Sequence, residues 1–411
     1  MKKYKLGELI EVTRGTSLSG NYYATSGDYI RLTCGNFDYR NNCFKENSSK
    51  DNIYYIGEFK SDFLLNEGDI ITPLTEQAIG LLGSTAWIPE SGKYIQSQDI
   101  GKIICKEKLL DKKFAYYLLS SKEVKKQLSA GAQQTKIRHT SPSKIKDCIV
   151  WIPSLYEQKN IGEILFNIDR KIALNKAINH NLVAMAKQLY DYWFVQFDFP
   201  NQDGKPYKSS GGKMVWNEKL KKEIPKEWDS CILSEISDIT MGQSPEGSSY
   251  NEKKEGIIFY QGSADFGAFF PSIRQYTTSP IRFAMKGDVL MSVRAPVGIV
   301  NIANNDCCIG RGLVSLRSKD SSTLYIYYLL KQLDFVFQKR NINGTTFGSI
   351  TKDDLSQLPI IKPCKEIIVN YEKICSSIFN KLISIDIELG SLTKQRDELL
   401  PLLMNGQVTV G

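Results

Sequence analysis

The stretch from Asn160 to Phe194 repeats apolar residues at alternating steps of three and four, which is the spacing of a coiled-coil seam. Its seam positions are Ile161, Leu165, Ile168, Ile172, Asn175, Asn179, Leu182, Ala186, Leu189 and Trp193. A second stretch has the same spacing at Tyr371, Cys375, Ile378, Leu382, Ile385, Leu389, Leu392, Arg396, Leu399 and Leu403. The pattern predicts two long helices that bury their apolar stripes against one another.

Two features of these helices have more than one interpretation. A buried asparagine at a seam position costs stability but can fix the register of a helix pair. Asn175 and Asn179 could instead face another subunit or solvent. The heptads themselves could be the core face of two helices in a scaffold with no further role.

Each predicted helix follows one copy of an internal repeat. Residues 6–15 are matched 227 positions later, with Leu6, Glu8, Leu9, Val12, Thr13 and Gly15 finding partners at 233–242. Further matches pair Gly68-Asp69 with Gly287-Asp288, a Tyr-Tyr-Leu-Leu block at 116–119 with one at 327–330, and 149–153 with 359–363. A repeat of this length predicts two similar globular domains, each followed by a helix.

The predicted fold is α+β, with two pseudo-repeated mixed α/β domains separated by a pair of long antiparallel coiled-coil helices. Short apolar runs after Gly-Asp turns predict strands, and the Tyr-Tyr-Leu-Leu blocks have helical spacing. The expected boundaries are 1–155 for the first domain, 156–197 for the first long helix, 198–228 for a linker, 229–364 for the second domain and 365–405 for the second long helix. Because the linker is rich in Pro, Gly, Ser and Lys, we expect it to be an exposed connection.

Two similar domains on an antiparallel helix pair would be related by an approximate two-fold axis. DNA has two-fold axes perpendicular to its length, so such a protein can place one domain on each of two separated half-sites. A helix of this length spans about 52 Å at about 1.5 Å per residue, which corresponds to about one and a half DNA turns. Helix length would then fix the gap between the half-sites.

Composition sets the broad class of the protein. A chain of 411 residues with 42% hydrophobic and 24% charged residues predicts two or more globular domains. We find no apolar run long enough to span a bilayer and no signal-peptide pattern, so we expect a cytoplasmic protein with no membrane partner. The nine cysteines lack metal-ligand spacing and are expected to be reduced and mostly buried, and the net charge of +8 is compatible with a polyanionic partner.

The sequence offers little catalytic chemistry. It lacks a phosphate-binding loop, Gly310-Arg311-Gly312 lacks the third glycine of a dinucleotide fingerprint, and no Asn/Asp-Pro-Pro-aromatic segment is present. The two histidines, His139 in a basic loop and His180 in the exposed register of the first helix, do not predict a paired catalytic or metal site. We therefore expect neither catalysis nor a bound metal or cofactor.

Basic, amide and hydroxyl side chains in the loops are candidates for DNA contact, because Arg suits guanine, Asn or Gln suits adenine, and Lys neutralises phosphate. The candidates are Arg31, Asn36, Gln133, Gln134, Lys136, Arg138, Arg274, Arg294, Arg311, Thr345 and Thr346, with Arg282 as a further basic residue. For each of them taken alone, a solvated surface side chain is the favoured interpretation, and only the set as a whole points to DNA contact.

Several segments resemble type I restriction-modification specificity subunits. These are 160–165 with 168–172, Leu189-Tyr190-Asp191-Tyr192-Trp193-Phe194, Phe197-Asp198-Phe199-Pro200 and Ile224-Pro225-Lys226-Glu227-Trp228. In the second half they are Gly287-Asp288-Val289-Leu290 with Arg294, Gly310-Arg311-Gly312-Leu313, and 346–350 leading to 358–360. The order of domain, helix, domain, helix is similar as well.

The resemblance implies a non-catalytic subunit that reads a bipartite, asymmetric sequence in double-stranded DNA. It further implies two modification subunits that methylate adenine with S-adenosylmethionine, and two restriction subunits that use ATP and Mg in the full complex. The helices would bind the modification subunits as well as set the spacer between the half-sites. The alternative is a coiled-coil scaffold protein that does not read DNA.

Overall fold

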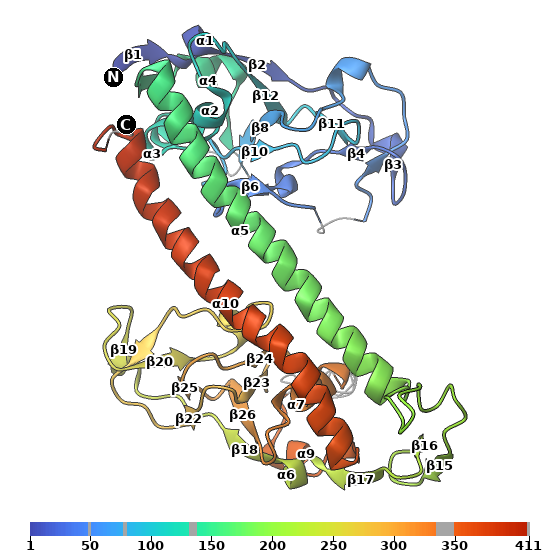
Figure 1. Ribbon diagram of the computed structural model, residues 1–411. Helices are drawn as coiled ribbons and strands as arrows, with labels where there is room; N and C mark the ends of the chain where they lie inside the picture. Colours follow the sequence, from blue (N-terminus) through green and yellow to red (C-terminus); the bar gives the residue numbers. More distant parts are fainter. Residues whose placement is uncertain (48–50, 77–79, 131–137, 334–348, 409–411) are drawn as a thin grey trace. The chain divides into compact units, whose positions relative to one another are not determined.

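The computed structural model describes residues 1–47, 51–76, 80–130, 138–333 and 349–408 (Figure 1). The chain divides into two compact units, Met1–Ala173 with Ser391–Gly411 and Leu174–Gly390. Each unit contains one repeat and a part of both long helices. Among the described residues, no helix is long and apolar enough to cross a membrane.

The first unit begins with the first repeat. Its elements are β1 (Lys2–Lys5), α1 (Leu6–Leu9), β2 (Ile10–Arg14), β3 (Tyr23–Ala24), β4 (Ile30–Arg31), β5 (Phe37–Asp38), β6 (Cys43–Phe44), β7 (Tyr54–Tyr55), β8 (Ile70–Pro73), β9 (Thr75–Glu76), β10 (Ala86–Trp87), β11 (Tyr94–Ile95), β12 (Ile100–Cys105), α2 (Lys112–Leu119), α3 (Lys122–Ala130), β13 (Arg138–His139), α4 (Pro142–Asp147), β14 (Ile149–Ile152) and the start of α5 (Leu155–Tyr190).

The second unit continues from α5 through a π-helical turn at Asp191–Val195. Its elements are β15 (Met214–Asn217), β16 (Lys222–Pro225), β17 (Asp229–Ile232), α6 (Leu233–Ile236), β18 (Ser237–Met241), β19 (Tyr250–Asn251), β20 (Ile257–Tyr260), β21 (Tyr276–Thr277), β22 (Phe283–Ala284), β23 (Val289–Ser292), β24 (Val300–Ile302), β25 (Cys307–Ile309), β26 (Leu313–Ser318), α7 (Thr323–Gln332), α9 (Lys352–Ser356), β27 (Pro359–Lys362) and α10 (Lys365–Met404), whose last turns return to the first unit.

The two repeats have the same topology, which confirms the predicted duplication. The main sheet has the order β10-β8-β12-β2 in the first repeat and β24-β23-β26-β18 in the second. The strand that opens each repeat pairs with the strand that closes it, β1 with β14 and β17 with β27. In a second sheet, β4 pairs in parallel with β11 and β20 in parallel with β25. The predicted mixed α/β class is therefore correct for both domains.

The repeated Gly-Asp pair builds the turn that begins β8 and β23. Gly68 and Gly287 have φ values of +77° and +92°, which favour glycine. The aspartate that follows accepts a backbone N–H three residues earlier, from Asn66 to Asp69 at 2.9 Å and from Met285 to Asp288 at 2.8 Å. This closed turn explains why the pair recurs in the sequence.

Each unit has apolar cores that join its domain to the helices. In the first unit, Ile161, Leu165, Leu403 and Met404 belong to the same buried cluster as Phe114 and Tyr117 of α2. In the second unit, Tyr190 and Trp193 pack in one cluster with Tyr325, Tyr371 and Leu382. The helices are thus parts of the domain cores.

The predicted seam positions of both helices are buried or half-buried throughout. Those of the first helix are Ile161, Leu165, Ile168, Ile172, Asn175, Asn179, Leu182, Ala186, Leu189 and Trp193, and those of the second are Tyr371, Cys375, Ile378, Leu382, Ile385, Leu389, Leu392, Arg396, Leu399 and Leu403. In the first unit Arg396 Nη1 lies 3.4 Å from Asp169 Oδ1, and in the second Asn175 Nδ2 lies 2.9 Å from Glu388 Oε2. Within the second unit the ring centroids of Tyr190 and Tyr371 also lie 6.3 Å apart, so residue numbers rise on α5 as they fall on α10 and the two helices run antiparallel there.

The segment 198–228 is folded, so the expectation that it is wholly an exposed connection is wrong. Met214–Asn217 and Lys222–Pro225 form an antiparallel hairpin. Trp228 stacks on Phe199 with ring centroids 4.8 Å apart and meets Phe197 edge-on at 5.6 Å. These aromatic residues bury enough apolar surface to order a segment whose composition is otherwise that of a linker.

All nine cysteines are free thiols, and each is buried or half-buried, as predicted. Burial raises the pKa of Cys34, Cys148, Cys231 and Cys375 to about 11, so these thiols stay protonated at neutral pH.

Candidate nucleic-acid interface

In each domain, the end of one strand of the main sheet meets the loop that precedes its neighbour. The strand is β8 and the loop precedes β12 in the first domain; in the second domain they are β23 and the loop before β26. In the second domain Val293 N donates to Gly312 O at 2.9 Å, and Ile350 N donates to Val293 O at 3.1 Å. In the first domain Leu74 N donates to Asp99 O at 2.7 Å, and Thr140 N donates to Leu74 O at 2.9 Å. We call this place the strand corner, formed by 74–75 with 98–99 in the first domain and by 293–294 with 311–312 in the second.

A repeated glycine packs a further loop against each strand corner. A Cβ atom on Gly15 would lie 2.2 Å from the Gln96 carbonyl oxygen, and one on Gly242 would lie 2.1 Å from the Gly310 carbonyl oxygen. The residue that follows donates its N–H across the same gap, from Thr16 to Gln96 O at 3.1 Å and from Gln243 to Ile309 O at 3.0 Å. Only glycine permits this approach, and both domains use it.

The second-domain strand corner presents two arginines. Leu313 pairs with Ser292, and the bond between Val293 and Gly312 continues the ladder, so Arg294 and Arg311 stand one residue further along on the two chains. Both side chains are exposed. Within the described residues neither forms an ion pair, whereas Arg274 and Arg317 of the same domain are held by Asp265 and Asp288.

The backbone around Arg311 is held by polar contacts. Arg311 N donates to Ser244 Oγ at 3.2 Å, and Gln261 Nε2 donates to the same oxygen at 2.9 Å. Cβ atoms on Gly310 and Gly312 would lie 2.8 Å and 2.7 Å from atoms of Gln261. The two glycines therefore let the loop lie directly on Gln261, which fixes the backbone at Arg311.

The first-domain strand corner presents different side chains at the same positions. Thr75 and Gln98 stand where the second domain has Arg294 and Arg311. Thr75 is buried and its hydroxyl donates to Asp99 Oδ1 at 2.9 Å, while Gln98 is exposed and its backbone carbonyl accepts from Arg14 Nε at 2.7 Å. The two corners thus share a backbone and differ in what they expose.

Comparison with known proteins identifies the chain. The model of the type I restriction modification DNA specificity domain matches residues 1–183 and 225–396. The chain belongs to this family.

Relatives in the type I specificity family cover most of the chain. A sequence assigned as the MjaX type I restriction enzyme specificity subunit of Methanocaldococcus jannaschii is 33% identical over 310 residues, which cover 72% of this chain and 68% of the relative. The HindI specificity subunit of Haemophilus influenzae is 24% identical over 62% of this chain and 68% of its own. The crystal structure of the type I S subunit from M. genitalium has the same fold, with a TM-score of 0.64, 18% identity and coverage of 98% and 96% of the two chains.

Two of the residues that the sequence predicts to contact DNA, Arg31 and Asn36, are buried and bonded within the first domain. Arg31 is 7% exposed, stacks on Tyr23 with its guanidinium carbon 3.8 Å from the ring centroid, and donates from Nη2 to Asn52 O at 3.1 Å. Asn36 is 2% exposed and accepts the Thr33 N–H at 2.9 Å. Both side chains hold loops in place, so we leave them out of the proposed DNA-reading set.

The remaining predicted contacts fall into three groups. Arg274 is exposed but held at 2.8 Å by the buried Asp265 carboxylate, and Arg282 is exposed next to β22. Arg138 begins β13, which pairs with β9, and its side chain lies outside the described residues. Gln133, Gln134, Lys136, Thr345 and Thr346 also lie outside the described residues.

Sequence reasoning missed Arg14, Gln98, Gln243 and Gln261. The signal for Arg14 and Gln243 was present, because each is adjacent to a repeated glycine. Gln98 comes close to Arg14, and Gln261 to Ser244, only through long-range pairing, which the sequence pattern does not show.

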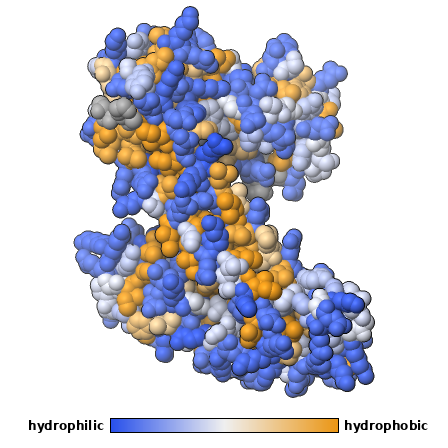
Figure 2. Space-filling view, in the orientation of Figure 1, coloured by the Kyte–Doolittle hydropathy of each residue, from blue (hydrophilic) through white to orange (hydrophobic). Residues whose placement is uncertain are grey.

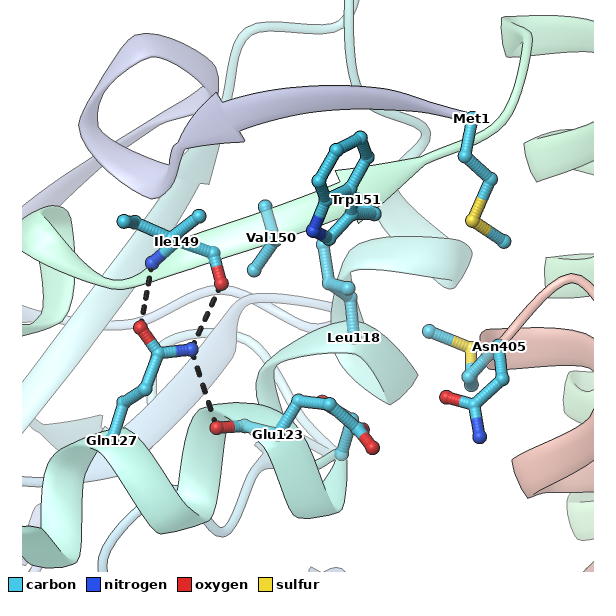
Figure 3. A pocket seen from close by; sticks show the side chains of 10 residues that line it. Met1, Leu118, Glu123, Gln127, Ile149, Val150, Trp151 and Asn405 are labelled. Atoms are coloured by element: carbon cyan, nitrogen blue, oxygen red, sulfur yellow. Dashed lines mark hydrogen bonds between the residues drawn. The ribbon is translucent and has the colours of Figure 1, made fainter.

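Two hollows of the first unit are lined by apolar side chains and by polar side chains with structural contacts. One of about 620 Å³ is lined by Met1, Trp151, Met404 and the polar Gln127, whose amide bridges to both Ile149 N and Ile149 O at 2.8 Å (Figure 3). Another, of about 700 Å³, has Trp87 and Phe166 in its wall, and its Asp111 and Glu163 are engaged with Phe114 N and Lys113. Within the described part of the chain, no cluster of three or more His, Cys, Asp or Glu side chains could hold a metal ion.

Proposed function

We propose that this chain is the DNA-reading subunit of a type I restriction-modification complex and that it reads a bipartite, asymmetric site. One domain reads each half-site. The observation that carries the proposal is the duplicated sheet topology, in which two domains of the same fold expose different side chains from equivalent loops. A duplicated scaffold suits a duplicated target, and different exposed residues suit two unequal half-sites.

The two long helices are proposed to set the gap between the half-sites and to bind two modification subunits. Apolar side chains that lie beside the seam support the second role. Leu174, Ile178 and Met185 of α5 recur at steps of four and seven and are all exposed. Hydrophobic atoms are visible along the helical surface (Figure 2), and exposed apolar stripes of this kind suit a protein partner.

The chemistry is proposed to belong to the partners. The modification subunits would bind S-adenosylmethionine and methylate adenine, and two restriction subunits would use ATP and Mg. This chain would be non-catalytic and would contribute DNA binding alone. Lys136 and Arg138 stay predictions for phosphate contact, because their side chains lie outside the described residues.

Co-expression tests the proposal. The chain is expressed with a cognate modification subunit in a host without other adenine methylation, and methylated adenines are mapped by sequencing. We expect a single two-part motif with a fixed gap, lost when this chain is omitted. Methylation without a motif, or a motif that persists without this chain, would instead favour a coiled-coil scaffold that reads no DNA.

A further inference from the structure

We propose that the strand corner is the base-reading element of both domains, with Arg311 reading guanine in one half-site and Gln98 reading adenine in the other. This inference rests on the proposed function and adds to it the residues and the base each reads.

Gln98 and Arg311 occupy equivalent positions because the backbone hydrogen bonds around them are the same in the two domains. The bond from Leu74 N to Asp99 O corresponds to the bond from Val293 N to Gly312 O, and that from Thr140 N to Leu74 O corresponds to that from Ile350 N to Val293 O. The glycine contacts of Gly15 and Gly242 place the neighbouring loop in the same way. Gln98 and Arg311 therefore start from the same place on the scaffold and differ in side chain.

The charge at the second corner calls for an anionic partner. Arg294 and Arg311 lie at adjacent positions of two paired chains, and within the described residues no carboxylate neutralises them. Two exposed arginines without a carboxylate partner suit the phosphates and base edges of a nucleic acid better than a neutral partner.

The chemistry of the two side chains sets the bases. The arginine guanidinium donates two parallel hydrogen bonds that match O6 and N7 of guanine, and the glutamine amide matches N6 and N7 of adenine. Arg311 is suited to this because its backbone is fixed by Ser244 and by the two glycines against Gln261. A fixed backbone lowers the entropy lost when the side chain binds a base edge.

Gln261 lies next to the strand corner of the second domain. Its amide group lies beside the Arg311 backbone through Ser244, and the side chain is exposed. We assign Gln261 the role of positioning Arg311, so Gln261→Ala is expected to weaken discrimination less than Arg311→Ala does.

The test first establishes the methylation motif of the native chain with its modification subunits, as above. Arg311→Ala and Gln98→Ala are then profiled in the same way, and each purified complex is titrated with duplexes in which every base pair of the motif is changed in turn. Lys253→Ala, an exposed charge elsewhere in the second domain, is the matched control.

We expect Arg311→Ala to lose about 10- to 100-fold of its discrimination at a G·C pair in one half-site only. Gln98→Ala should relax an A·T position in the other half only, and Lys253→Ala should leave the motif unchanged. Absence of a motif with the native chain would reject the proposed function itself. A native motif that survives Arg311→Ala and Gln98→Ala unaltered would overturn the assignment of the corner alone.

Complete loss of methylation in Arg311→Ala is resolved by Arg311→Gln and by binding at low salt. If Arg311→Gln binds with a changed base preference at the same position, base reading holds. If both variants bind every duplex uniformly more weakly with a shallower salt dependence, Arg311 contacts only phosphate and the proposal is overturned.

Discussion

Nδ2 of Asn175 on α5 donates a hydrogen bond to Oε2 of Glu388 on α10 at 2.9 Å, within the second unit. Asn175 is 6% exposed. The sequence allows two interpretations of Asn175, one in which it fixes the register of the helix pair and one in which it faces another subunit or solvent. Its burial and its partner on the facing helix favour the first. For Asn179, which is half-buried, Oδ1 has no hydrogen-bond partner within the described residues, so its role stays open.

Asn175→Ala is expected to lower the free energy of unfolding by about 1–2 kcal/mol, because the variant loses a hydrogen bond to a charged acceptor. Urea unfolding followed by circular dichroism measures the change. Lys176→Ala, one residue away on the exposed face, is the control and should lie within about 0.5 kcal/mol of the native chain. Equal effects of the two variants would show that the hydrogen bond contributes nothing.

Glu372 predicts a pH dependence of stability. Its carboxyl group on α10 accepts the Tyr325 N–H at the start of α7 at 2.9 Å, and burial raises its pKa from 4.5 to about 7. In the first domain the equivalent N–H, that of Phe114, is capped by Asp111 of its own helix at 2.9 Å. In the second domain the long helix α10 supplies this cap.

The native chain keeps a proton on Glu372 that the unfolded chain releases above pH 4.5. The contribution of this group to stability therefore falls as the pH rises from 4.5 to about 7 and is constant outside that window. Glu372→Gln should remove up to about 3 kcal/mol of this loss, because the amide keeps an acceptor and cannot ionise. Unfolding titrations at several pH values measure it, with the exposed Glu366→Gln as control; parallel pH profiles for native chain and Glu372→Gln would refute the assignment.

Two tryptophans of the segment 198–228 offer a matched pair. Trp228 is 5% exposed and stacked on Phe199, whereas Trp216 is 57% exposed on β15. Trp228→Ala should lower the free energy of unfolding by about 3–5 kcal/mol and Trp216→Ala by less than about 0.5 kcal/mol. Limited proteolysis should cut the segment in the first variant only. Equal proteolytic resistance would mean that this segment is held by something other than its aromatic stack.

Much of the fold could be predicted from local pattern. The heptad positions, the Gly-Asp turns and the repeat of Leu6–Gly15 at 233–242 depend on short spacing rules, and these elements lie where the pattern places them. The folded aromatic core of 198–228 was hidden, because Phe199, Tyr207 and Trp228 are scattered among lysines and glycines. Their stacking is a tertiary contact with no periodic signal.

The candidate site was less predictable. Arg31 and Asn36 look like loop residues, but their loops fold over them, since β4 lies inside the second sheet. Arg294 and Arg311 were found by residue type, yet their adjacency follows from the pairing of β23 with β26. Gln98 becomes the counterpart of Arg311 only when both domains are compared bond by bond.

Helix length should set the gap in the recognised site. Insertion of one heptad after Ala173 and another after Gly390 lengthens both helices at the boundary of the two units and leaves each unit intact. Seven residues add about 10 Å, equivalent to about three base pairs. Methylation mapping should show a wider gap and unchanged half-sites; insertion into one helix alone is the control and should abolish methylation, because the seams no longer match. An unchanged gap would show that helix length does not set the distance between the half-sites.

The most direct test of the account uses a chimaera in which residues 1–155 are replaced by the first domain of another family member. The methylation motif of this chimaera is mapped in the presence of the modification subunits of the native chain. The account predicts that one half of the motif changes to that of the donor while the other half and the gap stay those of the native chain. A change in both halves, or an unchanged motif, would contradict the claim that each domain reads one half-site.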